Sequence, residues 1–91
     1  MEMEMSPIEK MLDELKQEDV KSSGKRQVVV RGLICAITKL RAPMVFERWA
    51  ADVGVECVIN TVTDKWDGQN YIYGVLSVIR DMSSELYYKG E

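Results

Sequence analysis

Apolar residues between positions 6 and 20 recur every three or four residues, which predicts an amphipathic helix. Ser6 is expected to cap it, with Pro7 at its first position and Glu9 completing a capping box. The apolar stripe consists of Ile8, Met11, Leu12 and Leu15. Because the rest of this helix is charged, we expect the stripe to dock either onto the chain's own bundle or into a groove of a partner protein.

The next pattern spans residues 24–40, where three consecutive valines resemble a strand but the apolar residues beyond them keep helical spacing. The segment is also long for a strand, so we interpret it as a helix with Ser22 or Ser23 as its N-cap. Gly32 and Ala36 lie four residues apart, which predicts a helix face that another backbone approaches closely.

Residues 44–53 predict a third helix with Phe46, Trp49, Ala50 and Val53 on one side, where we expect them to face the core. The β-branched residues after Gly54 fit a strand, but their spacing also fits a helix. The helical stripe consists of Val55, Val58, Ile59, Val62 and Trp66. We interpret the helix as continuing through or just after Gly54, and the pattern leaves open whether residues 55–63 are helix or strand.

The clearest helical pattern lies in residues 70–88, with Asp67 or Asn70 as its cap and Gly68 in the turn before it. Its stripe consists of Ile72, Val75, Leu76, Ile79, Met82 and Leu86. The Asp67-Gly68 pair is also a signal for a β-hairpin. The stripe does not alternate as a strand would, so helix is the preferred interpretation.

These elements predict an all-α fold, a small bundle of three to four helices with a tethered N-terminal helix. Residues 1–20 form the acidic helix, 21–25 a flexible connector and 26–91 the helical core domain. The alternative is an α+β fold with a C-terminal β-hairpin over residues 55–79. A bundle this small often gains core by pairing, so we expect a homodimer or higher homo-oligomer.

Charge divides the chain into three blocks, although the net charge is only −3. Residues 1–20 carry −5, residues 21–50 carry +6 and residues 51–91 carry −4. We expect these blocks to neutralise one another on folding, and the acidic start to mask the basic middle if it folds over it.

Composition removes several chemistries. The chain has no histidine, the commonest general base and metal ligand, and its two cysteines alone cannot complete a zinc site. Cys35 and Cys57 have apolar neighbours and are expected to be buried. We therefore expect no enzyme activity, no metal and no cofactor. No apolar run is long enough to span a membrane, so a cytoplasmic protein is expected.

The sequence contains two further candidate sites. Ala50, Gly54 and Val55 fit the turn of a helix-turn-helix DNA-binding regulator, but the inward positions of its second helix would be Asn60 and Thr63, which are polar. We therefore do not expect nucleic acid as a partner, and a helix-turn-helix DNA-binding regulator is an alternative function only.

Lys25 and Arg26 follow a serine-glycine turn and form a possible phosphate-binding site for a nucleotide or another phosphate-bearing small molecule. The P-loop pattern is incomplete, because Asp19 stands where it requires glycine. Sequestering such a ligand is therefore an alternative function.

The leading hypothesis rests on the outer side of the last helix. Tyr73, Arg80 and Tyr87 lie there opposite the apolar stripe, interleaved with two serines. Tyrosine and arginine are enriched at interface hot spots. The sequence therefore predicts a small non-enzymatic protein-binding module, an adaptor or inhibitor that occupies a partner's surface through these three residues and the stripe of the N-terminal helix.

Overall fold

The computed structural model describes residues 6–40 and 42–89, and these form five helices and no strand. The helices are α1 (Pro7–Lys21), α2 (Gly24–Thr38), α3 (Met44–Val53), α4 (Val55–Lys65) and α5 (Tyr71–Lys89). The predicted all-α bundle is confirmed, with five helices in the described residues instead of the expected three to four. The alternative β-hairpin over residues 55–79 is wrong, because both of its expected strands are helical and residues 55–63 lie within α4.

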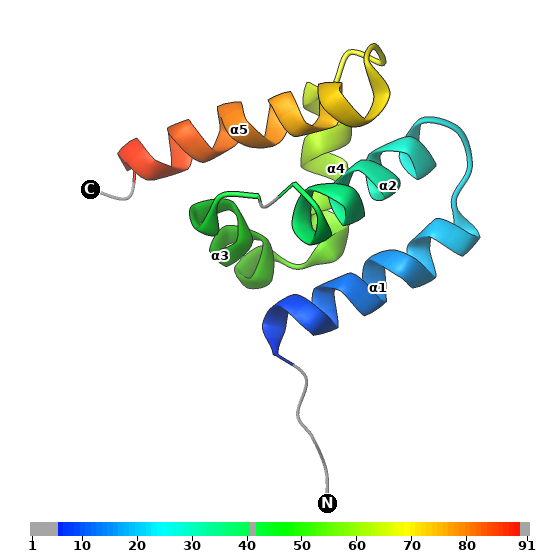
Figure 1. The fold of residues 1–91 in the computed structure, drawn as a ribbon, viewed down its shortest axis with the longest axis horizontal. Helices are drawn as coiled ribbons and strands as arrows, with labels where there is room; N and C mark the ends of the chain where they lie inside the picture. The colour runs from blue at the N-terminus through cyan, green and yellow to red at the C-terminus, as the bar shows by residue number, and fades with distance from the viewer. Residues whose placement is uncertain (1–5, 41, 90–91) are drawn as a thin grey trace, which may run out of the picture.

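Helix α2 lies in the middle of the bundle, with α1 along one side and α5 along the other (Figure 1). Helices α3 and α4 close the remaining sides. Every helix contributes a fully buried side chain to the shared core: Leu15, Leu33, Phe46, Ile59 and Ile79. One continuous core therefore includes the N-terminal helix.

Helix α1 begins as its sequence predicts. The Ser6 hydroxyl accepts a hydrogen bond from the Glu9 amide, and the Glu9 carboxylate accepts one from the Ser6 amide. Only Ser22 and Ser23 separate α1 from α2, so the connector is shorter than the expected 21–25. Ser23 stands at the N-cap of α2 but makes no capping hydrogen bond, whereas the Ser22 hydroxyl donates to the Glu18 carbonyl.

A single residue, Gly54, separates α3 from α4. Its φ of 92° and ψ of 158° belong to a backbone region that is essentially restricted to glycine. The first helix ends with the Gly54 amide donating to the Ala50 carbonyl, and the next begins with the Val58 amide donating to the Gly54 carbonyl. Gly54 is thus a junction between two helices.

The turn before α5 is held by local hydrogen bonds. Asp67 accepts one from the Gln69 amide, and the Trp66 indole donates one to the Gln69 carbonyl. Gly68 and Asn70 both adopt positive φ, at 87° and 55°. The predicted turn at Gly68 is therefore confirmed, and Asp67 stabilises the turn.

Helix α5 packs against the core along one side. Val75, Ile79 and Met82 of the predicted stripe are buried, whereas Ile72 at its start is exposed. Gly32 of α2 is buried directly beneath Val75, as expected for a close approach of two helices. This packing fixes which side of α5 faces outward.

One expectation about the cysteines is wrong. Cys57 is exposed, because the buried positions of α4 are Val55, Val58, Ile59 and Val62 and residue 57 lies beside that stripe. Cys35 is half-buried, and neither thiol forms a disulfide. Among the described helices, none combines the length and apolar character that crossing a membrane requires.

Candidate protein-docking surface

The side of α5 that faces away from the core carries Tyr73, Ser77, Arg80, Ser84 and Tyr87, here called the α5 outer face. All five residues are exposed, with 76% of Tyr73 and 62% of Tyr87 accessible. At 1.5 Å per residue the face extends for about 21 Å along the helix axis. The structure thus brings together the three docking residues that the sequence predicts on this helix.

Arg80 is the only charged residue of the α5 outer face. Within the part of the chain that the structure describes, its guanidinium forms neither an ion pair nor a hydrogen bond. Its five N–H donors are therefore available to a carboxylate of another molecule.

A groove of about 390 Å³ runs beside the C-terminal half of this face. One wall consists of Arg80, Ser84 and Tyr87, and the other of Pro43 and Val45 at the start of α3. The apolar wall beside exposed polar groups provides a place for an apolar side chain next to Arg80. Sequence reasoning did not include Pro43 and Val45, because the spacing within α5 contains no information about a neighbouring helix.

The docking residues predicted on α1 are used within the chain itself. Met11 and Leu15 are buried in the core, and Ile8 packs against it half-buried. Leu12 is partly buried as well. The sequence predicts that the stripe docks either onto the chain's own bundle or into a groove of a partner protein. In the structure it packs onto the chain's own bundle.

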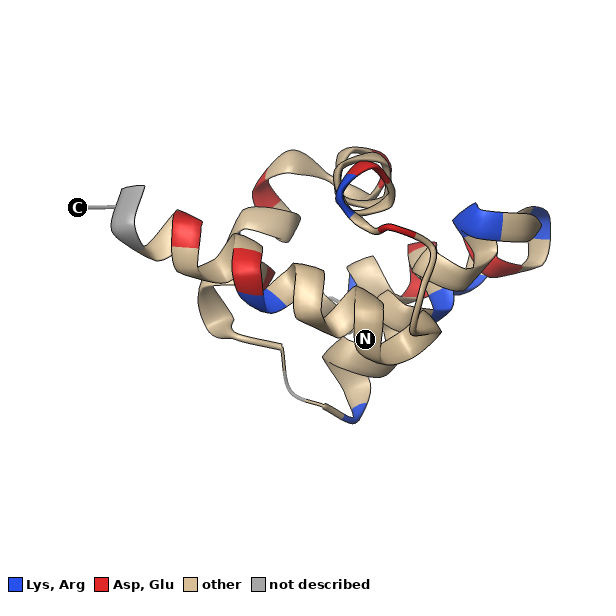
Figure 2. Ribbon diagram, turned by 90° about the horizontal axis from the view of Figure 1, so that it is seen from above, with Lys and Arg blue, Asp and Glu red and all other residues tan. Residues whose placement is uncertain are grey.

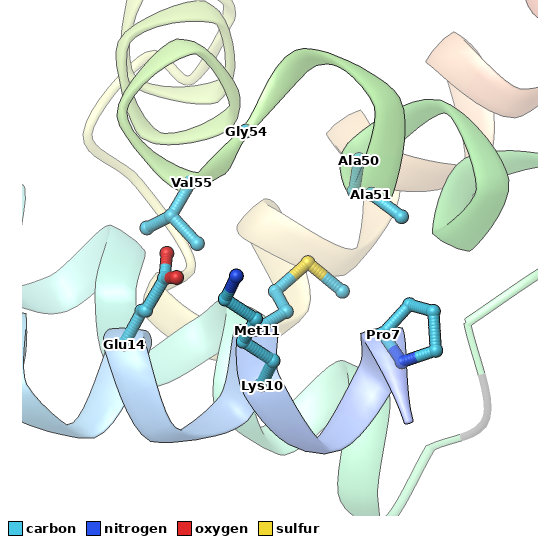
Figure 3. A pocket seen from close by; sticks show the side chains of 8 residues that line it. All are labelled: Pro7, Lys10, Met11, Glu14, Ala50, Ala51, Gly54 and Val55. Carbon is cyan, nitrogen blue, oxygen red and sulfur yellow. The ribbon is translucent and has the colours of Figure 1, made fainter. Parts of the chain in front are cut away.

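Docking of α1 leaves a pocket of about 410 Å³ between α1 and the junction at Gly54 (Figure 3). Met11 and Val55 extend into it, and Lys10 and Glu14 stand along its α1 side. No sequence pattern indicated this pocket, because its two sides lie about 40 residues apart in the chain.

The predicted phosphate site is occupied by the protein's own groups. Arg26 donates to the carboxylates of Glu56 at 2.8 Å and Glu18 at 3.1 Å. The hydrogen bond to Glu56, followed by that to Glu18, raises the pKa of Arg26 above its ordinary value. Lys25 lies over the Trp66 ring, 5.8 Å from its centroid. Arg26 therefore joins α1, α2 and α4, and its charge is already balanced.

The exposed side of α4, which would read DNA in a helix-turn-helix, carries two carboxylates. Glu56 and Asp64 lie there with Asn60 and Lys65. Carboxylates repel the phosphate backbone, so this side is poorly suited to nucleic acid. Among the described residues, no group of three or more Cys, Asp or Glu side chains is placed to hold a metal ion.

Charged groups lie mainly elsewhere than on the α5 outer face. Lys and Arg positions alternate with Asp and Glu positions at the end of the molecule farthest from the C-terminus (Figure 2).

Comparison with models of known protein families, with curated proteins and with solved structures finds no significant match to this chain.

Proposed function

We propose that the protein is a small non-enzymatic protein-binding module, an adaptor or inhibitor that occupies a partner's surface with the α5 outer face. The observation that carries this proposal is the alignment on one rigid helix of two exposed tyrosines with Arg80, which forms no ion pair with any described residue. Aromatic and arginine side chains supply most of the binding energy at many interfaces.

Rigidity supports the same proposal. The inner side of α5 is locked by Val75 and Ile79, which are fully buried. The docking side chains therefore stand on a scaffold that is already ordered, and binding does not have to order the backbone as well.

The chemistry of the face defines the partner. A carboxylate of the partner pairs with Arg80, and an apolar side chain enters the groove between Val45 and Tyr87. We place this activity in the cytoplasm, since both cysteines are free thiols, which suits a reducing compartment.

The test is recovery of partners by the immobilised full chain from a lysate of its native cells, quantified by mass spectrometry. The double variant Tyr73→Ala, Tyr87→Ala should lose at least about tenfold of a specific partner, because each truncation removes about 1 kcal/mol or more at a hot spot. Both side chains are exposed, so the variant should remain folded.

Tyr71→Ala is the matched control, because Tyr71 is 66% exposed on the same helix but lies outside the α5 outer face. It should recover partners as the wild type does. If the folded double variant recovers every partner at wild-type levels, the face is not the docking surface.

A further inference from the structure

Large and small residues alternate along the α5 outer face. Tyr73, Arg80 and Tyr87 are separated by Ser77 and Ser84 in a 4-3-4-3 rhythm. That rhythm has the 3.5-residue repeat of a seam between two packed helices. A serine between two large residues leaves a hollow on the helix surface, and a large residue of another helix fills such a hollow.

The same α5 from a second copy supplies that complementary helix when it runs antiparallel. With the two-fold axis midway between Arg80 and Ser84, each Arg80 lies opposite Ser84 of the other copy. Each Tyr87 then lies opposite the other copy's Ser77. Every large residue of the central contact meets a small one, and no large residue meets its own equivalent. A parallel pair would instead place Arg80 against Arg80.

Charge complementarity favours the antiparallel arrangement too. Asp81 follows Arg80 and borders the α5 outer face. Near a two-fold axis the guanidinium of one copy passes Ser84 of the other and comes within reach of that copy's Asp81. Symmetry forms this pair twice, which gives Arg80 the ion-pair partner that it lacks among the described residues of its own chain.

We infer that a second copy of this chain occupies the α5 outer face, with the two α5 helices antiparallel and Arg80 opposite Ser84. This inference rests on the proposed function, that the face docks protein, and names one occupant of it. Pairing covers Arg80 and Tyr87, so the dimer is a closed form and the monomer is the form that is open to other partners.

The small area of the contact between the two helices limits the affinity of the dimer. A contact about 21 Å long and one helix wide is smaller than the roughly 800 Å² per partner of a stable interface. The walls at Pro43 and Val45 extend it only modestly. We therefore expect a reversible dimer with a Kd on the order of 100 μM.

Sedimentation equilibrium between about 5 μM and 1 mM tests the inference on the full chain. Ser84→Glu places a carboxylate opposite Arg80 of the other copy and should tighten the dimer about three- to tenfold. Ser84→Lys places two cations together and should weaken it by a similar factor.

Ser77→Glu is the matched control, because it adds the same charge to the same face opposite Tyr87. It should not tighten the dimer. A chain that stays monomeric at 1 mM, or a dimer that Ser77→Glu tightens while Ser84→Glu does not, overturns the inference. A monomer that still loses its partner through Tyr73→Ala and Tyr87→Ala would leave the proposed function intact, so the two failures are distinguishable.

Discussion

Gly32 allows α2 to lie directly against α5. A Cβ atom at this position would stand 2.8 Å from both Cβ and Cγ1 of Val75, well inside van der Waals contact. Val75 is fully buried and cannot move aside without moving α5. The spacing of Gly32 and Ala36 predicted such an approach, but the sequence alone did not show which helix would supply it.

Gly32→Ala should therefore destabilise the protein. Overpacking costs about 1–3 kcal/mol, and the better helix propensity of alanine returns up to about 1 kcal/mol. A net loss of roughly 1–2 kcal/mol is expected in urea unfolding followed by circular dichroism. Val75→Ala removes two of the three close atoms. In that background Gly32→Ala should cost less, and an equal cost in both backgrounds would contradict this explanation.

At the scale of helices, the sequence predicted a bundle of three to four helices, and the structure has five because α3 and α4 are separate helices. The stripe from Val55 to Val62 fits the helix that the structure shows, because buried residues on one side of a helix recur at that spacing, although the sequence alone left a strand open. It could not decide the state of Gly54, since a glycine fits a kink, a junction or the start of a strand equally well. In the folded chain, Gly54 forms the junction between α3 and α4.

Gly54→Ala tests whether the junction depends on the glycine backbone. No atom lies within 4 Å of a Cβ built at this position, so the substitution meets no steric obstacle from its surroundings. Its cost comes from holding a φ of 92°, about 1–3 kcal/mol. Thermal unfolding should show the loss, and Gly54→Ser should lose about as much as Gly54→Ala. An alanine variant as stable as the wild type would show that the junction adapts.

Across the whole molecule, the candidate face could be predicted only in part. Tyr73, Arg80 and Tyr87 share one helix, so their spacing sufficed to place them together. The opposite groove wall at Val45 comes from another helix, and no local pattern shows such a neighbour. The same limit applies to Arg26, whose strongest partner, Glu56, lies 30 residues away in the sequence.

The charge blocks of the chain neutralise one another at the packing of α1 on α2. Glu18 pairs with Arg26, and Asp19 accepts a hydrogen bond from Arg31 at 2.9 Å. The acidic end of α1 therefore lies against the basic start of α2. This arrangement reduces the positive potential that the residues of α2 would present alone.

Removing those two acidic charges should unmask the basic middle. The double variant Glu18→Gln, Asp19→Asn keeps the shape of both side chains and leaves Met11 and Leu15 in the core. Deletion of α1 would instead expose the core to solvent. Heparin should then bind severalfold more tightly at about 20 mM salt, and the gain should fade as salt shortens the Debye length.

Asp13→Asn with Glu14→Gln makes the same change in net charge on α1, but neither of these acids forms an ion pair with α2. If this second pair strengthens heparin binding equally, net charge alone explains the effect. A gain confined to Glu18→Gln with Asp19→Asn means that the contact of α1 with Arg26 and Arg31 lowers the affinity of the chain for polyanions.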